Sequence, residues 1–225
     1  MELKSLVGAL SADRLTGYRR TGRSESAEHI LQRYLWNIQL CEALYPVLNL
    51  LEVTLRNTLH SALWQHTGHE DWYATFPFDQ REAQSIQDAV NLLKRNRKPV
   101  APGAVVAEMS FGFWCSLFDV RYEYGQRLWP WLAGKTLPHA PRHERQRKTL
   151  SRRLNRLRLL RNRVFHYELI WHWHDLTVQH AEAVEFLTWL NVDMATVLAS
   201  VDRFSAIHSA GEQGAPLLSI SQTIA

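Results

Sequence analysis

The stretch Lys148–His166, with the sequence KTLSRRLNRLRLLRNRVFH, decides the fold class of this chain. Its apolar residues return every three or four positions, which is the spacing of one buried face of an α-helix. They are Leu150, Leu154, Leu157, Leu160 and Val164. We therefore predict a basic amphipathic helix over roughly 143–166.

The rest of the chain also has the pattern of helices, and no part of it alternates as a strand would. Leucines at helical spacing over residues 44–62 predict helices at 26–44 and 46–66, which Pro46 breaks or kinks because it cannot donate the helical hydrogen bond. An ordered aromatic loop is expected over 68–79. Further helices are predicted over 80–97, 104–108, 111–118, 119–133 and 175–201. The expected fold is an all-α helical bundle.

Length and composition predict a protein of the reducing cytosol. The 225 residues fit one large domain or two small ones, and we expect a single domain over 1–204 with a flexible tail over 205–225, which is rich in Ser, Gly and Gln. Cys41 and Cys115 lack the paired spacing of a disulfide framework or a metal site. We see neither a signal peptide nor an apolar stretch near the roughly 18 residues that span a membrane. The chain is therefore expected to be cytoplasmic and not membrane-bound.

Positive charge is concentrated in one segment, although the net charge is only +4. Ten basic residues lie between positions 142 and 163: Arg142, Arg145, Arg147, Lys148, Arg152, Arg153, Arg156, Arg158, Arg161 and Arg163. Such a surface would attract a phosphate-rich polymer, so RNA is a candidate partner.

This segment ends in Arg161, Asn162 and, four residues later, His166. Arginine has a planar fork that fits phosphate oxygens, and histidine can move a proton near neutral pH. Residues four apart share a helix face, so Asn162 can orient His166, whereas Arg161 is offset from His166 by roughly 140° and must bend round to it. On spacing alone, a solvated face of a basic helix is the favoured interpretation, because Arg-x4-His often occurs by chance.

The segment Leu160–Glu168 resembles the signature of the Abi-like (abortive infection) proteins of the HEPN superfamily, which is Arg-x4–6-His with a polar residue after the arginine. Residues 35–57 and 109–114 resemble the same family pattern, so the resemblance covers most of 30–175. It implies a HEPN-type helical bundle with additional helices and a ribonuclease activity, commonly in a homodimer whose two motifs face one another. It also implies a toxin or anti-phage defence effector, with an antitoxin, either protein or RNA, as a partner.

We therefore expect a metal-independent endoribonuclease in which the ribose 2′-OH attacks the adjacent phosphate. His166 would act as general base or acid, and Arg161 would stabilise the charge on the phosphate oxygens. Asn162 would position His166 or the phosphate. The products would carry a 2′,3′-cyclic phosphate and a 5′-OH. The alternative is a non-catalytic helical module that binds RNA or a partner protein through the basic helix.

A second group of candidates precedes this segment. Glu52, Arg56 and His60 lie four residues apart on one polar stripe, where Glu52 and Arg56 can form a surface ion pair. The family pattern includes Glu-x3-Arg-Asn, so the resemblance favours a supporting role for Glu52, Arg56 and Asn57. Glu52 would hold Arg56 or Arg161, and Arg56 would bind phosphate. The other supporting or RNA-binding candidates are Arg158, Arg163 and Glu168.

Histidines after the motif raise the question of zinc. His172 and His174 are two residues apart, a weak metal spacing, and no Cys pair or HExxH pattern accompanies them. We expect no metal and no cofactor. Trp171 and Trp173 in the same segment can stack on unpaired RNA bases, or can serve as core or interface anchors.

Overall fold

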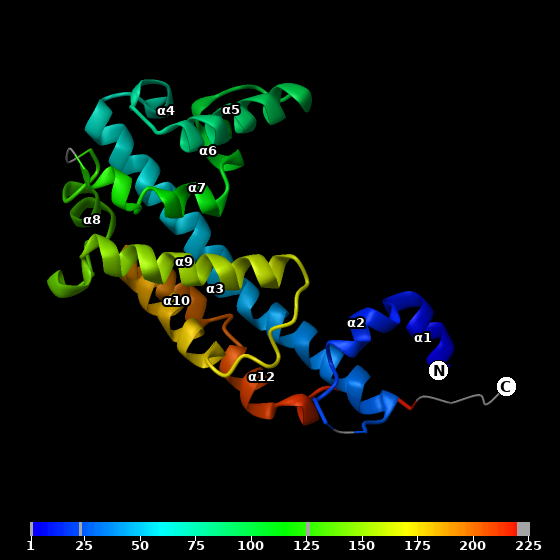
Figure 1. The fold of residues 1–225 in the computed structure, drawn as a ribbon. Coiled ribbons are helices and arrows are strands. Elements are labelled where there is room, and N and C mark those ends of the chain that lie inside the picture. The colour runs from blue at the N-terminus through cyan, green and yellow to red at the C-terminus, as the bar shows by residue number, and fades with distance from the viewer. Residues whose placement is uncertain (1, 23, 125–126, 220–225) are drawn as a thin grey trace. The chain divides into compact units, whose positions relative to one another are not determined.

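The computed structural model describes residues 2–22, 24–124 and 127–219 (Figure 1). Within these ranges the chain is mostly helical and has no β-strand, which confirms the all-α prediction. Residue contacts divide the chain into two compact units: unit 1 comprises Met1–Pro46, Leu160–Ala181 and Ser200–Ala225, and unit 2 comprises Val47–Leu159 and Glu182–Ala199. The unit boundaries fall inside three helices, so a single domain over 1–204 stays a prediction.

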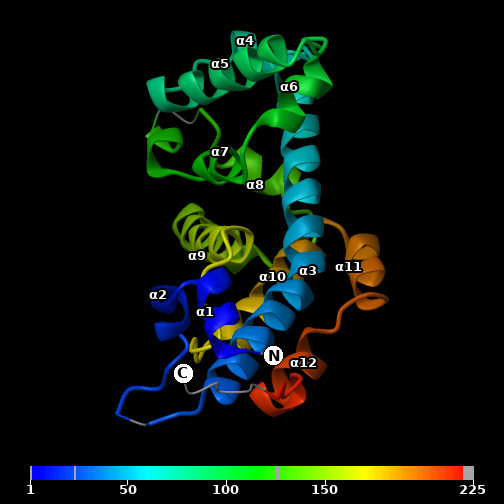
Figure 2. The ribbon, with the colours of Figure 1, turned by 90° about the vertical axis from the view of Figure 1, so that its right-hand side faces the viewer.

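Unit 1 contains the first part of the long helix α3 (Ala27–Thr67) and the ends of the chain. The short helices α1 (Leu3–Leu10) and α2 (Ala12–Thr16) contact each other (Figure 2). The last turn of α9 (Arg147–Phe165), the start of α10 (Leu176–Leu190), α12 (Phe204–Ala210) and the 3-10 helix η4 (Glu212–Gly214) complete the unit. Its buried core includes Tyr18, Leu31, Leu40, Leu44, Leu160, Ile170 and Phe204.

A buried arginine of α3 ties the end of the chain into unit 1. Arg33, which is 1% exposed, donates from Nη2 to Glu25 Oε1 at 2.8 Å, from Nε to Glu212 Oε2 at 2.7 Å and from Nη1 to the Tyr18 carbonyl. The sequence predicted a loose tail after residue 204, and the structure instead has α12 and η4 there. The prediction was wrong because a Ser- and Gly-rich composition does not reveal that Glu212 neutralises a buried guanidinium. Residues 220–225 lie outside the described residues.

Unit 2 contains the remainder of α3, α9 and α10 together with the middle of the chain. Its other elements are α4 (Trp72–Thr75), α5 (Gln80–Arg95), α6 (Pro102–Glu108), α7 (Phe111–Ser116), η1 (Val120–Tyr122), α8 (Trp131–Thr136), η3 (Arg142–Glu144) and α11 (Val192–Ala199). Helices α5 and α6 lie side by side (Figure 1). The helices predicted over 80–97, 104–108 and 111–118 are thus confirmed, and the aromatic loop over 68–79 contains the short helix α4.

Three predicted helices differ from the structure. The segment predicted as one helix over 119–133 contains η1 and the start of α8, and its described residues form no continuous helix. Helix α3 continues through Pro46, although proline there costs about 3 kcal/mol, because Leu44 and Val47 on either side are fully buried. The helix predicted over 175–201 is divided at Asn191, whose side-chain Oδ1 accepts a hydrogen bond from the Met194 N–H at 3.0 Å and so starts α11.

Helix α3 also corrects the expectation that no segment is long and apolar enough for a membrane. Among the described helices, it passes that test by length and composition, with a hydropathy of 1.2 over its most apolar window. The central helix of a water-soluble protein has the same properties. A cytoplasmic location therefore stays a prediction.

Candidate functional site

The backbone around His166 is fixed by the way α9 ends in unit 1. The Tyr167 N–H donates to the Val164 carbonyl at 3.4 Å, and the Glu168 N–H donates to the Arg163 carbonyl at 2.9 Å. These two bonds form a Schellman motif, with His166 as the C-terminal cap of the helix. Tyr167 has the positive φ of 58° that this motif needs and that glycine usually supplies.

Arg161 and His166 lie at this helix end. The guanidinium of Arg161 lies over the ring of Phe165, with Cζ 4.3 Å from the ring centroid. His166 is exposed, and its backbone N–H donates to the Asn162 carbonyl at 2.9 Å. Within residues 2–22, 24–124 and 127–219, the His166 imidazole makes no hydrogen bond or ion pair, so the expected orientation of His166 by the Asn162 side chain is absent. Both ring nitrogens are therefore available for hydrogen bonds with other groups.

A buried asparagine, which the sequence did not single out as a functional residue, holds the loop after His166. Asn37 is 3% exposed, and its Oδ1 accepts hydrogen bonds from the N–H groups of Ile170 and Trp171 at 2.8 and 3.1 Å. Arg14 in α2 adds a bond from Nη2 to the Tyr167 carbonyl at 2.7 Å. These bonds satisfy loop groups that would otherwise be unpaired, so they fix the path of the chain beyond His166.

Two of the supporting candidates lie close together, Arg163 in the last turn of α9 and Glu168 in the loop that follows it. Arg163 Nη1 lies 3.3 Å from Glu168 Oε2, and the Arg163 Cζ is 5.1 Å from the ring centroid of Trp173. Both charged side chains are more than two-fifths exposed, so the pair contributes at most about 1 kcal/mol. Arg163 thus orients the loop as well as adding positive charge.

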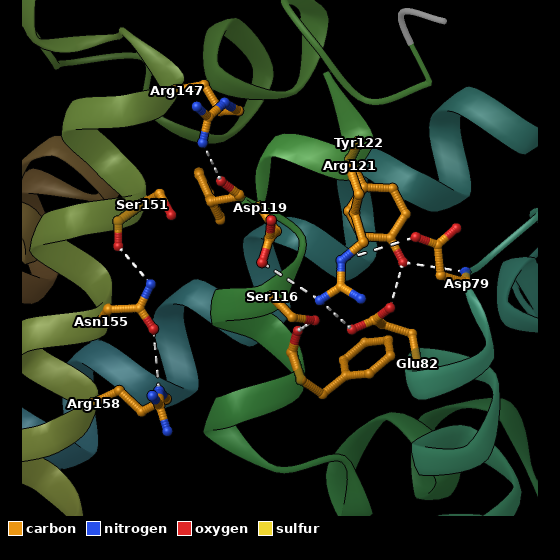
Figure 3. Close-up of polar contacts among 12 residues, drawn as sticks. Asp79, Glu82, Ser116, Asp119, Arg121, Tyr122, Arg147, Ser151, Asn155 and Arg158 are labelled. Carbon is orange, nitrogen blue, oxygen red and sulfur yellow. Dashed lines mark hydrogen bonds and ion pairs between the residues drawn. The ribbon is translucent and has the colours of Figure 1, made fainter. Parts of the chain in front are cut away.

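The remaining supporting candidates belong to unit 2. Arg56 donates from Nε to Asn57 Oδ1 at 3.2 Å, and the Glu52–Arg56 ion pair stays a prediction. Arg158 donates from Nε to Asn155 Oδ1 at 3.3 Å (Figure 3). Because Arg161 belongs to unit 1, a contact between it and Glu52 stays a prediction.

His60, on the same stripe, has a structural role in unit 2. The Trp72 indole Nε1 donates to His60 Nδ1 at 2.8 Å, and the ring of His60 lies between those of Trp64 and Trp72, with centroid distances of 5.9 and 6.2 Å. Burial lowers the pKa of His60, and only the neutral ring can accept the bond from Trp72.

The basic run is less positive than its sequence suggested. Four of its arginines pair with carboxylates: Arg147 with Glu123, Arg153 with Glu144 and Glu185, Arg156 with Glu182, and Arg163 with Glu168. Arg152, by contrast, is exposed and makes no hydrogen bond or ion pair with the described residues. Paired charges attract phosphate less, so fewer cations are available to an RNA strand than the sequence count indicates.

Unit 2 also holds a polar cluster that the sequence did not reveal (Figure 3). Glu82, which is 1% exposed, accepts a hydrogen bond from the Tyr122 hydroxyl at 2.7 Å and lies 3.4 Å from Arg121 Nη2. Burial, followed by the hydrogen bond to Glu82, raises the pKa of Tyr122. Arg127 Nη2 donates to Asp79 Oδ1 at 2.9 Å. Since Glu82 and Asp79 are both paired with arginines, we assign this cluster to holding η1 against the start of α5.

A cavity of about 750 Å³ lies beside the helix end in unit 1. Val164, Phe165 and Tyr167 line it, together with Tyr18, whose hydroxyl is buried and has no hydrogen-bond partner among the described residues. Burial raises the pKa of Tyr18 to about 12. Neither Arg161 nor His166 is among the described residues that line this cavity, so the motif itself is an open surface site.

No cluster of three or more His, Cys, Asp or Glu side chains that could hold a metal occurs in the part of the chain that the structure describes. Comparison with protein-family models, curated proteins and solved structures found no match for this chain.

Proposed function

We propose that this chain is a metal-independent endoribonuclease of the HEPN type, built as a HEPN-type helical bundle. The main support is the position of Arg161 and His166 at the end of α9. The Arg161 guanidinium lies over Phe165, the residue directly before an exposed His166. A permanent cation and a proton carrier are thus held at one helix end, which is the combination that cleavage next to a 2′-OH requires.

In the proposed reaction, the 2′-OH of the ribose loses its proton as its oxygen attacks the adjacent phosphorus. The 5′-oxygen of the next nucleotide gains a proton as it leaves. The products are a 2′,3′-cyclic phosphate and a 5′-OH. His166 carries out one of these proton transfers, and Arg161 donates hydrogen bonds to the phosphate oxygens on which negative charge increases.

One imidazole serves only one of the two proton transfers in a single step, so a second proton carrier would help. We propose a homodimer in which the exposed His166 of a second copy supplies it, since two-fold interfaces are the commonest kind in oligomers. The family resemblance adds the proposal of a cytoplasmic toxin or anti-phage effector that an antitoxin, protein or RNA, holds inactive.

A specific observation favours one alternative, a non-catalytic module that binds RNA or a protein. No side-chain partner among the described residues orients the His166 ring, whereas catalytic imidazoles are usually held by a second group. Binding by such a module would depend on summed charge and would tolerate the loss of His166.

A cleavage assay in EDTA separates the two functions. Wild-type protein should cut single-stranded RNA and leave the same sequence in DNA intact, since DNA lacks the 2′-OH. A folded His166→Ala variant should bind RNA normally and cut none, and Arg161→Lys should also be impaired because it loses the planar fork. Arg81→Ala is the matched control, because Arg81 is an exposed arginine of α5 that lies outside the basic run. Full cleavage by folded His166→Ala, or cleavage that stops in EDTA and returns with a metal, would contradict the proposal.

A further inference from the structure

A second cavity of unit 1, of about 790 Å³, has walls of a different chemistry. Three tryptophans, an arginine and two histidines are among the residues that line it. They are Trp36, Trp171, Trp173, Arg19, His172 and His208. Trp171 and Trp173 belong to the loop that begins at His166. A volume of this size suits a ligand of a few tens of atoms.

The tryptophans of this cavity are held in place before any ligand arrives. The Trp171 N–H is bonded to Asn37, and the Arg33 Cζ lies 5.0 Å from the Trp171 ring centroid. Arg163 lies in the same way over Trp173, at 5.1 Å. Trp36 donates from Nε1 to the Ile207 carbonyl at 3.3 Å. A cation covers one face of each loop tryptophan, so only the opposite face can stack on a ligand ring.

Polar groups without a protein partner accompany these rings. The Trp171 Nε1 is buried and has no hydrogen-bond partner among the described residues. The exposed Arg19 guanidinium likewise has none within residues 2–22, 24–124 and 127–219, whereas its neighbour Arg20 is paired with Glu212 at 3.0 Å. Burial, together with the positive charge of Arg163 and His174, lowers the pKa of His172. His172 is therefore largely neutral at pH 7 and can both donate and accept a hydrogen bond.

We propose that this cavity binds one unpaired nucleotide of an RNA strand, with the base stacked on Trp173 and the phosphate on Arg19. Aromatic side chains stack on the face of any base, and an arginine fork fits a phosphate. The cavity would then select single-stranded RNA, because a base in a duplex is not free to enter. The inference rests on the proposed function only in naming the strand as RNA.

Binding can be measured apart from cleavage with a fluorescein-labelled single-stranded oligonucleotide whose riboses are 2′-O-methylated, since the blocked 2′-oxygen cannot attack. Fluorescence anisotropy should show about tenfold weaker binding for Trp173→Ala and most of the affinity retained in Trp173→Phe. Arg19→Ala should weaken binding several-fold and reduce its dependence on salt by about one phosphate contact. Arg19 is exposed and without a side-chain partner among the described residues, so this variant keeps the fold.

Two substitutions outside the cavity are the matched controls. Trp64→Ala removes a tryptophan that is 45% exposed in unit 2, and Arg81→Ala removes an exposed arginine of α5 that lies outside the basic run. Both should bind as the wild type does. Equal affinity of Trp173→Ala and Arg19→Ala with these controls would overturn the proposal, as would a free mononucleotide that binds as tightly as the oligonucleotide, or a duplex that binds as tightly as the single strand.

The two proposals fail in distinguishable ways. Binding of the methylated strand through Trp173 and Arg19, without any cleavage of unmodified RNA, would support the nucleotide site and contradict the nuclease proposal. Cleavage of RNA that depends on His166, with unchanged strand binding in both cavity variants, would support the nuclease proposal and contradict the nucleotide site.

Discussion

The guanidinium of Arg161 lies over the ring of Phe165, with its Cζ 4.3 Å from the ring centroid. Phe165 in turn stacks on Tyr45 of α3, with the ring centroids 5.5 Å apart and the planes 28° from parallel. An ideal helix would place Arg161 and His166 roughly 140° apart, and the stack draws the arginine towards the residue that precedes the histidine. Phe165 is thus a positioning residue for Arg161.

Replacing Phe165 by Leu should lower the rate of RNA cleavage about 3- to 30-fold, because a cation–π contact contributes about 0.5–2 kcal/mol. Phe165→Tyr should keep most of the rate, since the ring remains. The decisive measurement is a double-mutant cycle: in an Arg161→Ala background, Phe165→Leu should cost nothing further. An unchanged penalty in that background would mean that Phe165 acts by packing alone.

Tyr167 is held in the left-handed conformation with φ of 58°, and its side chain is 75% exposed. Tyr167→Gly should therefore stabilise unit 1 by roughly 0.5–1 kcal/mol, because it removes the steric cost of a Cβ at this position. Tyr167→Ala is the matched control, since it loses the same ring and keeps the Cβ. Denaturant unfolding of both variants tests the difference, and a gain in the alanine variant equal to that of glycine would argue against backbone strain.

The helical class and most helix positions could be predicted from the sequence, because the periodicity of leucines such as Leu150 and Leu154 reports burial directly. Local signals failed where distant contacts decide. Pro46 should end a helix by its own chemistry, yet the buried residues around it outweigh its cost. The segment that contains Glu212 looks unstructured until its partner Arg33, 179 positions away, is known.

The residue types of the candidate site could be taken from the sequence, but their contacts could not. The sequence identified Arg161 and His166 as candidates, and they lie at one helix end. It could not reveal that Arg161 lies on Phe165, because a helix permits several side-chain directions at that spacing. It also could not show that Asn37 anchors the following loop, since the partners are 133 and 134 residues apart.

Glu212→Gln should destabilise the protein by about 1–3 kcal/mol, because it removes a negative charge that is paired with the buried Arg33. The Arg33 side chain is only 2% exposed. Glu42→Gln is the matched control in the same unit. Its pair with Arg203 is more than half exposed on both sides, so its loss should cost less than about 1 kcal/mol. Equal unfolding free energies for the two variants would show that the segment containing Glu212 contributes little to the fold.

Stability should fall as the pH drops below about 6.5, the usual pKa of histidine. Burial lowers the pKa of His60 in the folded protein, so the folded state binds fewer protons than the unfolded state. The contribution of His60 to the free energy of unfolding is therefore fully present above the pKa of this histidine in the unfolded state. It is lost as the pH falls below that value. Denaturant unfolding at pH 7.5 and 5.5 measures the change.

The contribution of His60 can be isolated with His60→Gln, whose amide oxygen can still accept a bond from Trp72. This variant should lose less stability between pH 7.5 and 5.5 than the wild type does. His172 and His180, whose pKa values burial also lowers, act in the same direction in both proteins. The low pKa of Glu25, about 2, affects stability only below this window. An identical pH dependence in wild type and variant would remove the assignment to His60.

The proposed homodimer predicts complementation between two inactive variants. A shared cleft would hold two copies of Arg161 and two of His166, so the Arg161→Ala homodimer lacks every arginine and the His166→Ala homodimer lacks every histidine. A mixed dimer retains one of each, and the mixture should therefore cut RNA faster than either variant alone. Mixing each variant with the double variant is the control and should restore nothing. A wild-type protein that is strictly monomeric in solution yet cleaves at full rate, or a mixed dimer that stays inactive, would show that each chain works alone.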